Sequence, residues 1–146
     1  MSHADSLLRA AVLFGCMATL ACAAPPKPSP ELLAPTEAQM KLRSFQSRTF
    51  ELDDRERAMR GVIAALQDLG FIIERANEPL GLVTAARFAE PNYTDIIAVT
   101  VTVRPQDGGR MLIRVNAIFN NKPIEDPEAY QNFFATLERS LFLNKG

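Results

Sequence analysis

Two runs of alternating apolar and polar residues, Ile97-Ala-Val-Thr-Val-Thr-Val103 and Met111-Leu-Ile-Arg-Val-Asn-Ala-Ile-Phe119, decide the fold of this chain. Side chains of a β-strand alternate between its two faces, so each run is typical of a strand with one buried face and one face in water. Between the runs, Pro105-Gln106-Asp107-Gly108-Gly109 has the residue types of a hairpin turn. The two runs therefore predict a long antiparallel hairpin.

Further strands are expected on the amino-terminal side of this hairpin. Phe71–Arg75 and Leu82–Phe88 are separated by the turn residues Asn77–Gly81, which predicts a second antiparallel hairpin. The segment Lys41–Leu52 is rich in aromatic and hydroxyl residues, so it is predicted to be a strand, with a bulge where its alternation breaks. These segments bring the sheet to about five strands.

Two segments have apolar residues at the three- and four-residue spacing of an amphipathic helix. The first follows a capping aspartate at Asp53 or Asp54 and ends at Gly70, and the second begins at Asp126-Pro127-Glu128. Their apolar positions are Met59, Val62, Ile63, Leu66 and Leu69 in the first, and Tyr130, Phe133, Phe134, Leu137 and Leu141 in the second. In a chain of this size, both helices most simply pack on one face of a single antiparallel sheet, which predicts an α+β two-layer sandwich.

The amino-terminal segment has the parts of a bacterial lipoprotein signal peptide. A polar start with one cation at Arg9 precedes an uncharged run, Ala10–Ala21, and Thr19-Leu20-Ala21-Cys22 places small residues before a cysteine. The uncharged run is about twelve residues long, whereas a membrane-spanning helix needs about twenty. Residues 1–21 are therefore predicted to be removed, and Cys22 to become the lipid-modified first residue of the mature chain.

Lipidation also accounts for an odd cysteine. Cys16 lies within the predicted signal peptide, so Cys22 would otherwise remain a single thiol in an exported chain. The alternative is an ordinary secretory signal cut after one of the alanines, with Cys22 incidental. Ala23 follows the cysteine where inner-membrane lipoproteins often have an aspartate, so the expected location is the periplasmic face of the outer membrane.

The first residues of the mature chain are predicted to be a tether. Residues 22–36 contain five of the ten prolines of the chain, which favours an extended spacer between the lipid and the folded part. The alternative is that these prolines only keep a terminus soluble. The single α+β domain is expected to occupy residues 37–146.

Composition argues against several classes of function. The 16 Lys and Arg residues are balanced by 17 Asp and Glu residues, so no concentrated cationic face for nucleic acid is expected. The one histidine, His3, lies in the signal peptide, which leaves the mature chain without an imidazole base or metal ligand. We therefore expect no catalytic residues, no metal and no cofactor beyond the lipid on Cys22. A carboxylate-based glycan hydrolase stays as an alternative, with acids near predicted loops at Glu90, Asp95, Asp107, Glu125 and Asp126.

The favoured function is a non-catalytic interaction or assembly module that binds an envelope protein or a glycan. Its candidate binding residues lie on the wet side of the long hairpin: Thr100, Thr102, Arg114, Asn116 and Asn120. The predicted first strand, with Arg43 and Arg48, is a candidate edge that could accept a partner strand. The alternative is that these polar side chains simply solvate an exposed sheet. A carrier of a lipid or small apolar ligand is a further alternative, with a cavity lined by Phe133, Phe134, Phe119 and Met59.

The chain also resembles a family of small uncharacterised proteobacterial lipoproteins from Arg43 to Leu143. The matching stretches are Arg43-Ser44-Phe45-Gln46, Leu66-Gln67-Asp68-Leu69-Gly70-Phe71, Leu80-Gly81-Leu82, Asp126-Pro127-Glu128-Ala129-Tyr130-Gln131-Asn132-Phe133-Phe134 and Ser140-Leu141-Phe142-Leu143. The segment between Phe88 and Asp95 is shorter than is typical of the family. The resemblance implies a single domain on a lipid anchor, with no catalytic residues to carry over. The expected architecture is also similar to that of accessory lipoproteins of outer-membrane assembly machines, by analogy of fold alone.

Overall fold

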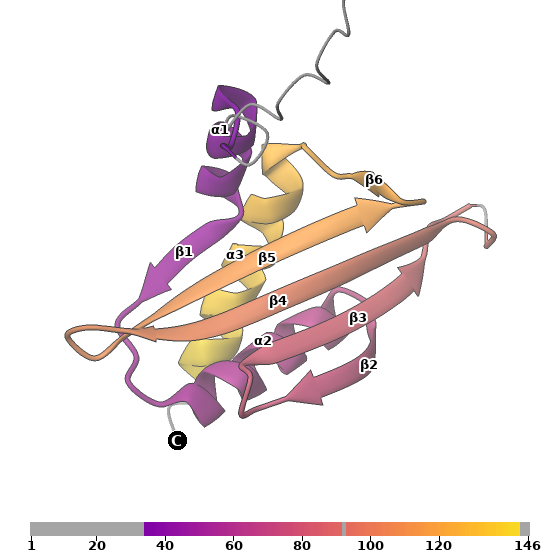
Figure 1. Cartoon of the computed structure of the whole chain (residues 1–146). Coiled ribbons are helices and arrows are strands. Elements are labelled where there is room, and N and C mark those ends of the chain that lie inside the picture. Colours follow the sequence, from indigo (N-terminus) through magenta and orange to yellow (C-terminus); the bar gives the residue numbers. More distant parts are fainter. Residues whose placement is uncertain (1–33, 92, 144–146) are drawn as a thin grey trace, which may run out of the picture. The chain divides into compact units, whose positions relative to one another are not determined.

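The computed structural model describes residues 34–91 and 93–143 of the chain. Within these residues, the centre of the fold is a six-stranded antiparallel sheet (Figure 1). The strands are β1 (Ser47–Phe50), β2 (Ile72–Asn77), β3 (Leu82–Phe88), β4 (Ile96–Gln106), β5 (Arg110–Phe119) and β6 (Lys122–Pro123). They are ordered β1-β5-β4-β3-β2, and β6 also pairs with β5.

Helices α2 (Arg55–Asp68) and α3 (Pro127–Leu143) lie side by side across one face of the sheet (Figure 1). The expected α+β architecture is confirmed, and both of these helices were predicted from their apolar periodicity. Asp54 caps α2, because its carboxylate accepts a hydrogen bond from the backbone N–H of Arg57 at 3.1 Å. Asp126 does the same for α3 by accepting from the N–H of Glu128 at 3.0 Å.

The core lies between these two helices and the sheet. The alternation of β4 and β5 is confirmed, since one residue in two along each strand is buried under the helices. These core positions are Val99, Val101 and Val103 on β4 and Met111, Ile113, Val115 and Ala117 on β5. Gly61 of α2 permits a close approach to α3, because a Cβ there would run into the side chain of Leu141.

The prediction of a strand over Lys41–Leu52 is wrong in its first half. Residues Glu37–Phe45 form a helix, α1, and only Ser47–Phe50 enter the sheet. A capping box starts α1: Thr36 Oγ1 accepts from Gln39 N at 3.2 Å, and Gln39 Oε1 accepts from Thr36 N at 3.0 Å. This cap outweighs the strand propensity of the residues that follow it. The described residues therefore contain α1 in addition to the two predicted helices, three in all.

The outer edge of β5 is occupied along most of its length. Beyond the residues paired with β1, the N–H of Val115 donates to the carbonyl of Gln46 at 2.8 Å. The N–H of Ile124 donates to the carbonyl of Ala117 at 2.9 Å, and β6 pairs with the last two residues of β5. Gln46 therefore joins the two elements, because its own N–H still donates to the carbonyl of Leu42 in α1 at 3.1 Å while its carbonyl accepts from β5.

The turn between β2 and β3 packs directly on β4. Gly81 has a φ of 61°, in the left-handed region, and its carbonyl accepts a hydrogen bond from Val103 N at 2.7 Å. A Cβ at this position would overlap the carbonyl oxygen of Val103. The predicted turn is thus confirmed, and glycine is required at its last position by both backbone conformation and space.

Candidate functional site

One face of the sheet, opposite α2 and α3, is not covered by any helix of the described residues (Figure 1). We call this the open face. Thr100 pairs with Asn116 on it, and Thr102 pairs with Arg114. The four side chains lie next to one another, so these predicted binding residues form one continuous polar surface. Arg114 Nε donates to Ser47 Oγ of β1 at 3.1 Å, which extends this surface to the edge strand.

Asn120 does not belong to that polar surface. It lies beyond the end of β5 with a φ of 44°, and its Oδ1 accepts from the N–H of Ile96 at 3.0 Å. Its Nδ2 donates to Asp95 Oδ1 at 2.8 Å. The amide therefore fastens the ends of β4 and β5 together, which is a structural role that the alternation pattern alone does not predict.

The two arginines of the predicted edge are also placed differently from the expectation. Arg43 lies on α1 and not on a strand, because the capping box extends helix over its position. Arg48 does lie on β1, but it is paired in register with the core residue Ile113 and so points to the helix side. Arg48 Nη1 contacts Glu138 Oε1 of α3 at 2.7 Å, and its guanidinium lies 4.8 Å from the centre of the Phe134 ring. These contacts tie β1 to α3.

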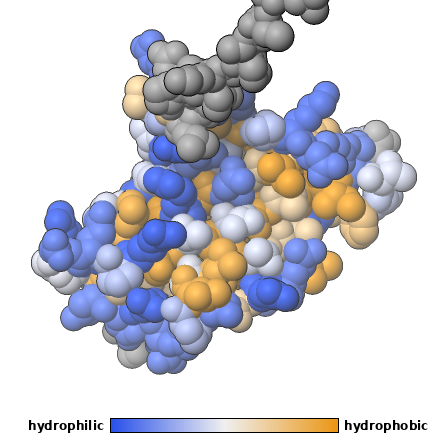
Figure 2. Space-filling model, viewed as in Figure 1, coloured by the Kyte–Doolittle hydropathy of each residue, from blue (hydrophilic) through white to orange (hydrophobic). Residues whose placement is uncertain are grey.

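An apolar row crosses the open face beside the polar surface. It takes one residue from each of five strands, in direct register: Ile72, Ala86, Ala98, Ile118 and Pro123. Phe88 and Ile96 form the next pair along β3 and β4 on the same face. The exposed fraction is 70% for Ile72, 56% for Phe88 and 45% for Ile96. Figure 2 shows this apolar surface over the ends of β3, β4 and β5 near β6, while polar side chains occupy much of the remaining face.

The sequence reasoning missed this row, although part of its signal was present. Ala98 and Ile118 occupy positions that the alternation assigns to water, where an apolar residue is unexpected. Their neighbours Ile72 and Ala86 come from other strands, so the row depends on how those strands pair. Exposed apolar residues that are contiguous, unlike scattered ones, are typical of an interaction surface.

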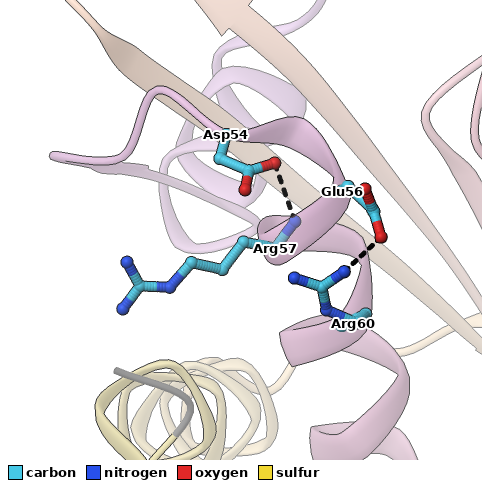
Figure 3. A network of polar contacts seen from close by, with 4 residues as sticks. All are labelled: Asp54, Glu56, Arg57 and Arg60. Atoms are coloured by element: carbon cyan, nitrogen blue, oxygen red, sulfur yellow. Dashed lines mark hydrogen bonds and ion pairs between the residues drawn. The ribbon is translucent and has the colours of Figure 1, made fainter. Parts of the chain in front are cut away.

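The charged residues at the start of α2 form a separate polar network (Figure 3). Asp54 holds the backbone of Arg57, and Glu56 forms an ion pair with Arg60 one helical turn later. The Arg57 side chain extends away from both carboxylates, and its Nη2 donates to the carbonyl of Leu141 in α3 at 3.2 Å. The contacts of Asp54 and Arg57 in this network therefore cap α2 and join it to α3.

Among the residues that the structure describes, no three His, Cys, Asp or Glu side chains are grouped as metal ligands. No helix of this part of the chain is both long enough and apolar enough to cross a membrane. The predicted signal peptide, Cys22 and the tether before Ala34 lie outside the described residues.

Comparison with known proteins yields a distant structural similarity. No protein-family model and no curated protein matches the sequence. The structure is similar to the adenylate sensor from AMP-activated protein kinase in complex with 5-aminoimidazole-4-carboxamide 1-beta-D-ribofuranotide, with a TM-score of 0.46 and 13% sequence identity. The similarity covers 65% of this chain and 94% of the sensor chain.

Proposed function

We propose that this chain is a lipid-anchored envelope protein whose folded part is a non-catalytic module that binds a protein partner through the open face. The observation that carries the proposal is the apolar row beside the polar surface of Thr100, Thr102, Arg114 and Asn116. Protein interfaces combine an apolar centre with a polar rim that supplies directional hydrogen bonds. The open face offers both on a rigid support, because β4 and β5 are held from behind by the core.

The proposed place of action is the periplasmic face of the outer membrane, with Cys22 carrying the anchor. This part of the proposal is supported by the sequence around the cysteine and by Ala23 after it. One protein-bound acyl chain gives only marginal membrane binding, whereas two or more hold a protein stably. A multiply acylated Cys22 would therefore confine the open face to partners within reach of the lipid surface.

Replacing Cys22 with serine is expected to abolish palmitate incorporation and move the protein from the membrane fraction to the soluble fraction. Serine cannot form the thioether on which the lipid is carried, so no acyl chain remains. Radiolabelled palmitate in growing cells, followed by membrane fractionation, measures both effects. Cys16→Ser is the matched control and should leave labelling unchanged, because Cys16 lies in the segment that is removed. Equal labelling of wild type and Cys22→Ser would overturn the anchor.

The open face is tested by photo-crosslinking in intact cells. A photoreactive residue at Ile96 is expected to give a discrete protease-sensitive adduct, whereas one at Gln131, on the exposed side of α3, should give none. Ile72→Asp should remove the Ile96 adduct, because a carboxylate in the apolar row must be desolvated when a partner covers it. Leu80→Asp is the matched control, since Leu80 is 70% exposed, as Ile72 is, but lies in the turn after β2.

Three outcomes of that experiment would contradict the proposal. Equal adducts from Ile96 and Gln131, or an Ile96 adduct that Ile72→Asp leaves intact, would mean that the open face is not the binding surface. An adduct that resists protease and is degraded by glycan-cleaving enzymes would identify a glycan partner and not a protein.

A further inference from the structure

A cavity of about 260 Å³ lies between the helices and the sheet, at the end of the fold near β6. It is on the covered side of the sheet, opposite the open face. Most of its wall residues are apolar and come from the end of α2 and from β4, β5 and α3, among them Leu66, Leu69, Val99, Val115, Ala117 and Phe133, while α3 also contributes the polar groups of Tyr130 and Asn132. Of the four residues predicted from sequence to line a cavity, Phe133 does so, and Phe134, Phe119 and Met59 are not among the lining residues.

The cavity has one cationic side chain, Arg87 at the end of β3. Arg87 is paired in register with Ile97, a residue of the helix-covered side, so it stands over the cavity and not on the open face. Its guanidinium lies 5.1 Å from the centre of the Phe71 ring. The ion pairs of the described residues join Arg48 to Glu138 and Arg60 to Glu56, so no described carboxylate neutralises Arg87.

Exposure distinguishes the entrance from the interior of this cavity. Leu66, Val115 and Phe133 are buried, whereas Arg87 and Ala129 are exposed. The charge therefore stands where the cavity meets solvent, and the apolar walls lie deeper. An apolar interior offers water too few hydrogen-bond partners, so it favours an apolar occupant over water.

We propose that this cavity binds a free fatty acid of medium chain length, with the carboxylate on Arg87 and the alkyl tail between α2, α3 and the sheet. The volume is slightly below the range of about 300 to 1,000 Å³ typical of ligand sites, which suits a tail of medium length. The guanidinium offers paired N–H donors that match a carboxylate, and stacking on Phe71 orients them. This site does not depend on the function of the open face.

Titration of the full-length Cys22→Ser chain with octanoate and with 1-octanol, followed by calorimetry, tests the site. Octanoate is expected to bind, and Arg87→Gln should weaken its binding about tenfold, because a hydrogen bond to a charged group is lost. The affinity for 1-octanol should change less than about twofold in the same variant, because the alcohol does not form that charged pair.

A second pair of variants separates binding in the cavity from adsorption elsewhere. Ala129→Phe places a ring at the entrance and is expected to abolish octanoate binding. Ala135→Phe adds the same ring at an exposed position of α3 that does not line the cavity, and it should bind as the wild type does. Thermal unfolding of each variant verifies that the fold is kept.

Three results would overturn the assignment. They are absence of octanoate binding to the unmodified cavity, binding that Ala129→Phe leaves unchanged, and equal effects of Arg87→Gln on octanoate and on 1-octanol. The crosslinking at Ile96 reports on the opposite face, so failure of one proposal is distinguishable from failure of the other.

Discussion

Gly81→Ala is expected to lower the free energy of unfolding by about 2 to 5 kcal/mol, which is a large fraction of the stability of an ordinary small domain. Two costs combine. A left-handed conformation costs an alanine about 1 to 2 kcal/mol. The new Cβ would also overlap the carbonyl oxygen of Val103, and relief of such a clash by backbone movement costs about 1 to 3 kcal/mol. Movement there also disturbs the hydrogen bond from Val103 N to the Gly81 carbonyl.

Gly70→Ala is the matched control for this prediction. Gly70 also has a positive φ, 79°, but a Cβ there would meet no atom within 4 Å. Gly70→Ala should therefore lower the free energy of unfolding only by the cost of the left-handed backbone conformation, about 1 to 2 kcal/mol. Urea unfolding of the two variants and the wild type gives the difference between them, which isolates the contact with Val103. Equal losses in both variants would refute the steric argument.

The second large effect is expected for Leu137→Ala, a loss of about 2 to 5 kcal/mol of unfolding free energy. Leu137 lies on α3 with none of its surface exposed, and it contacts α2 close to Gly61. Shortening it leaves a hole that the rigid sheet and two helices cannot close. The lost burial and the remaining cavity therefore add together.

Leu143→Ala makes the same chemical change on the same helix. Leu143 is 85% exposed, so its replacement should alter the unfolding free energy by no more than about 0.5 kcal/mol. Thermal or urea unfolding monitored by circular dichroism measures both variants. A Leu137→Ala protein as stable as Leu143→Ala would mean that α3 does not pack on α2 as described.

The elements that could be predicted from sequence are those with a strong periodic signal. Val99, Val101 and Val103 identify β4 because the strand is long enough for its alternation to be unambiguous. α2 is equally clear, since its apolar stripe and its cap at Asp54 agree. α1 was missed because its cap, Thr36 with Gln39, lies at the end of the proline-rich segment and α1 itself has no buried residue. Its two core-facing residues, Leu42 and Phe45, are only partly buried and supply a single helical spacing, which is too short to establish a helical period.

The candidate sites were predictable only in part, for a related reason. The face on which Thr100 and Thr102 lie follows from alternation within one strand. The apolar row requires the register of five strands, and neither Ile72 nor Ala86 contains that information by itself. The cavity beside Arg87 is even harder to predict from sequence, because its shape arises from packing between α2, α3 and the sheet.

The closed outer edge of β5 has a consequence for self-association. A bare sheet edge is a template for another chain, and long flat edges promote aggregation. Here the backbones of Gln46 and Ile124 form hydrogen bonds with the outer edge of β5, and β1, which pairs with that edge, is only four residues long. The strand at the opposite border of the sheet, β2, has a register shift between Ile73 and Arg75. Short or irregular borders are poor templates for polymer growth. Many copies could therefore be crowded together on one surface without joining into fibrils.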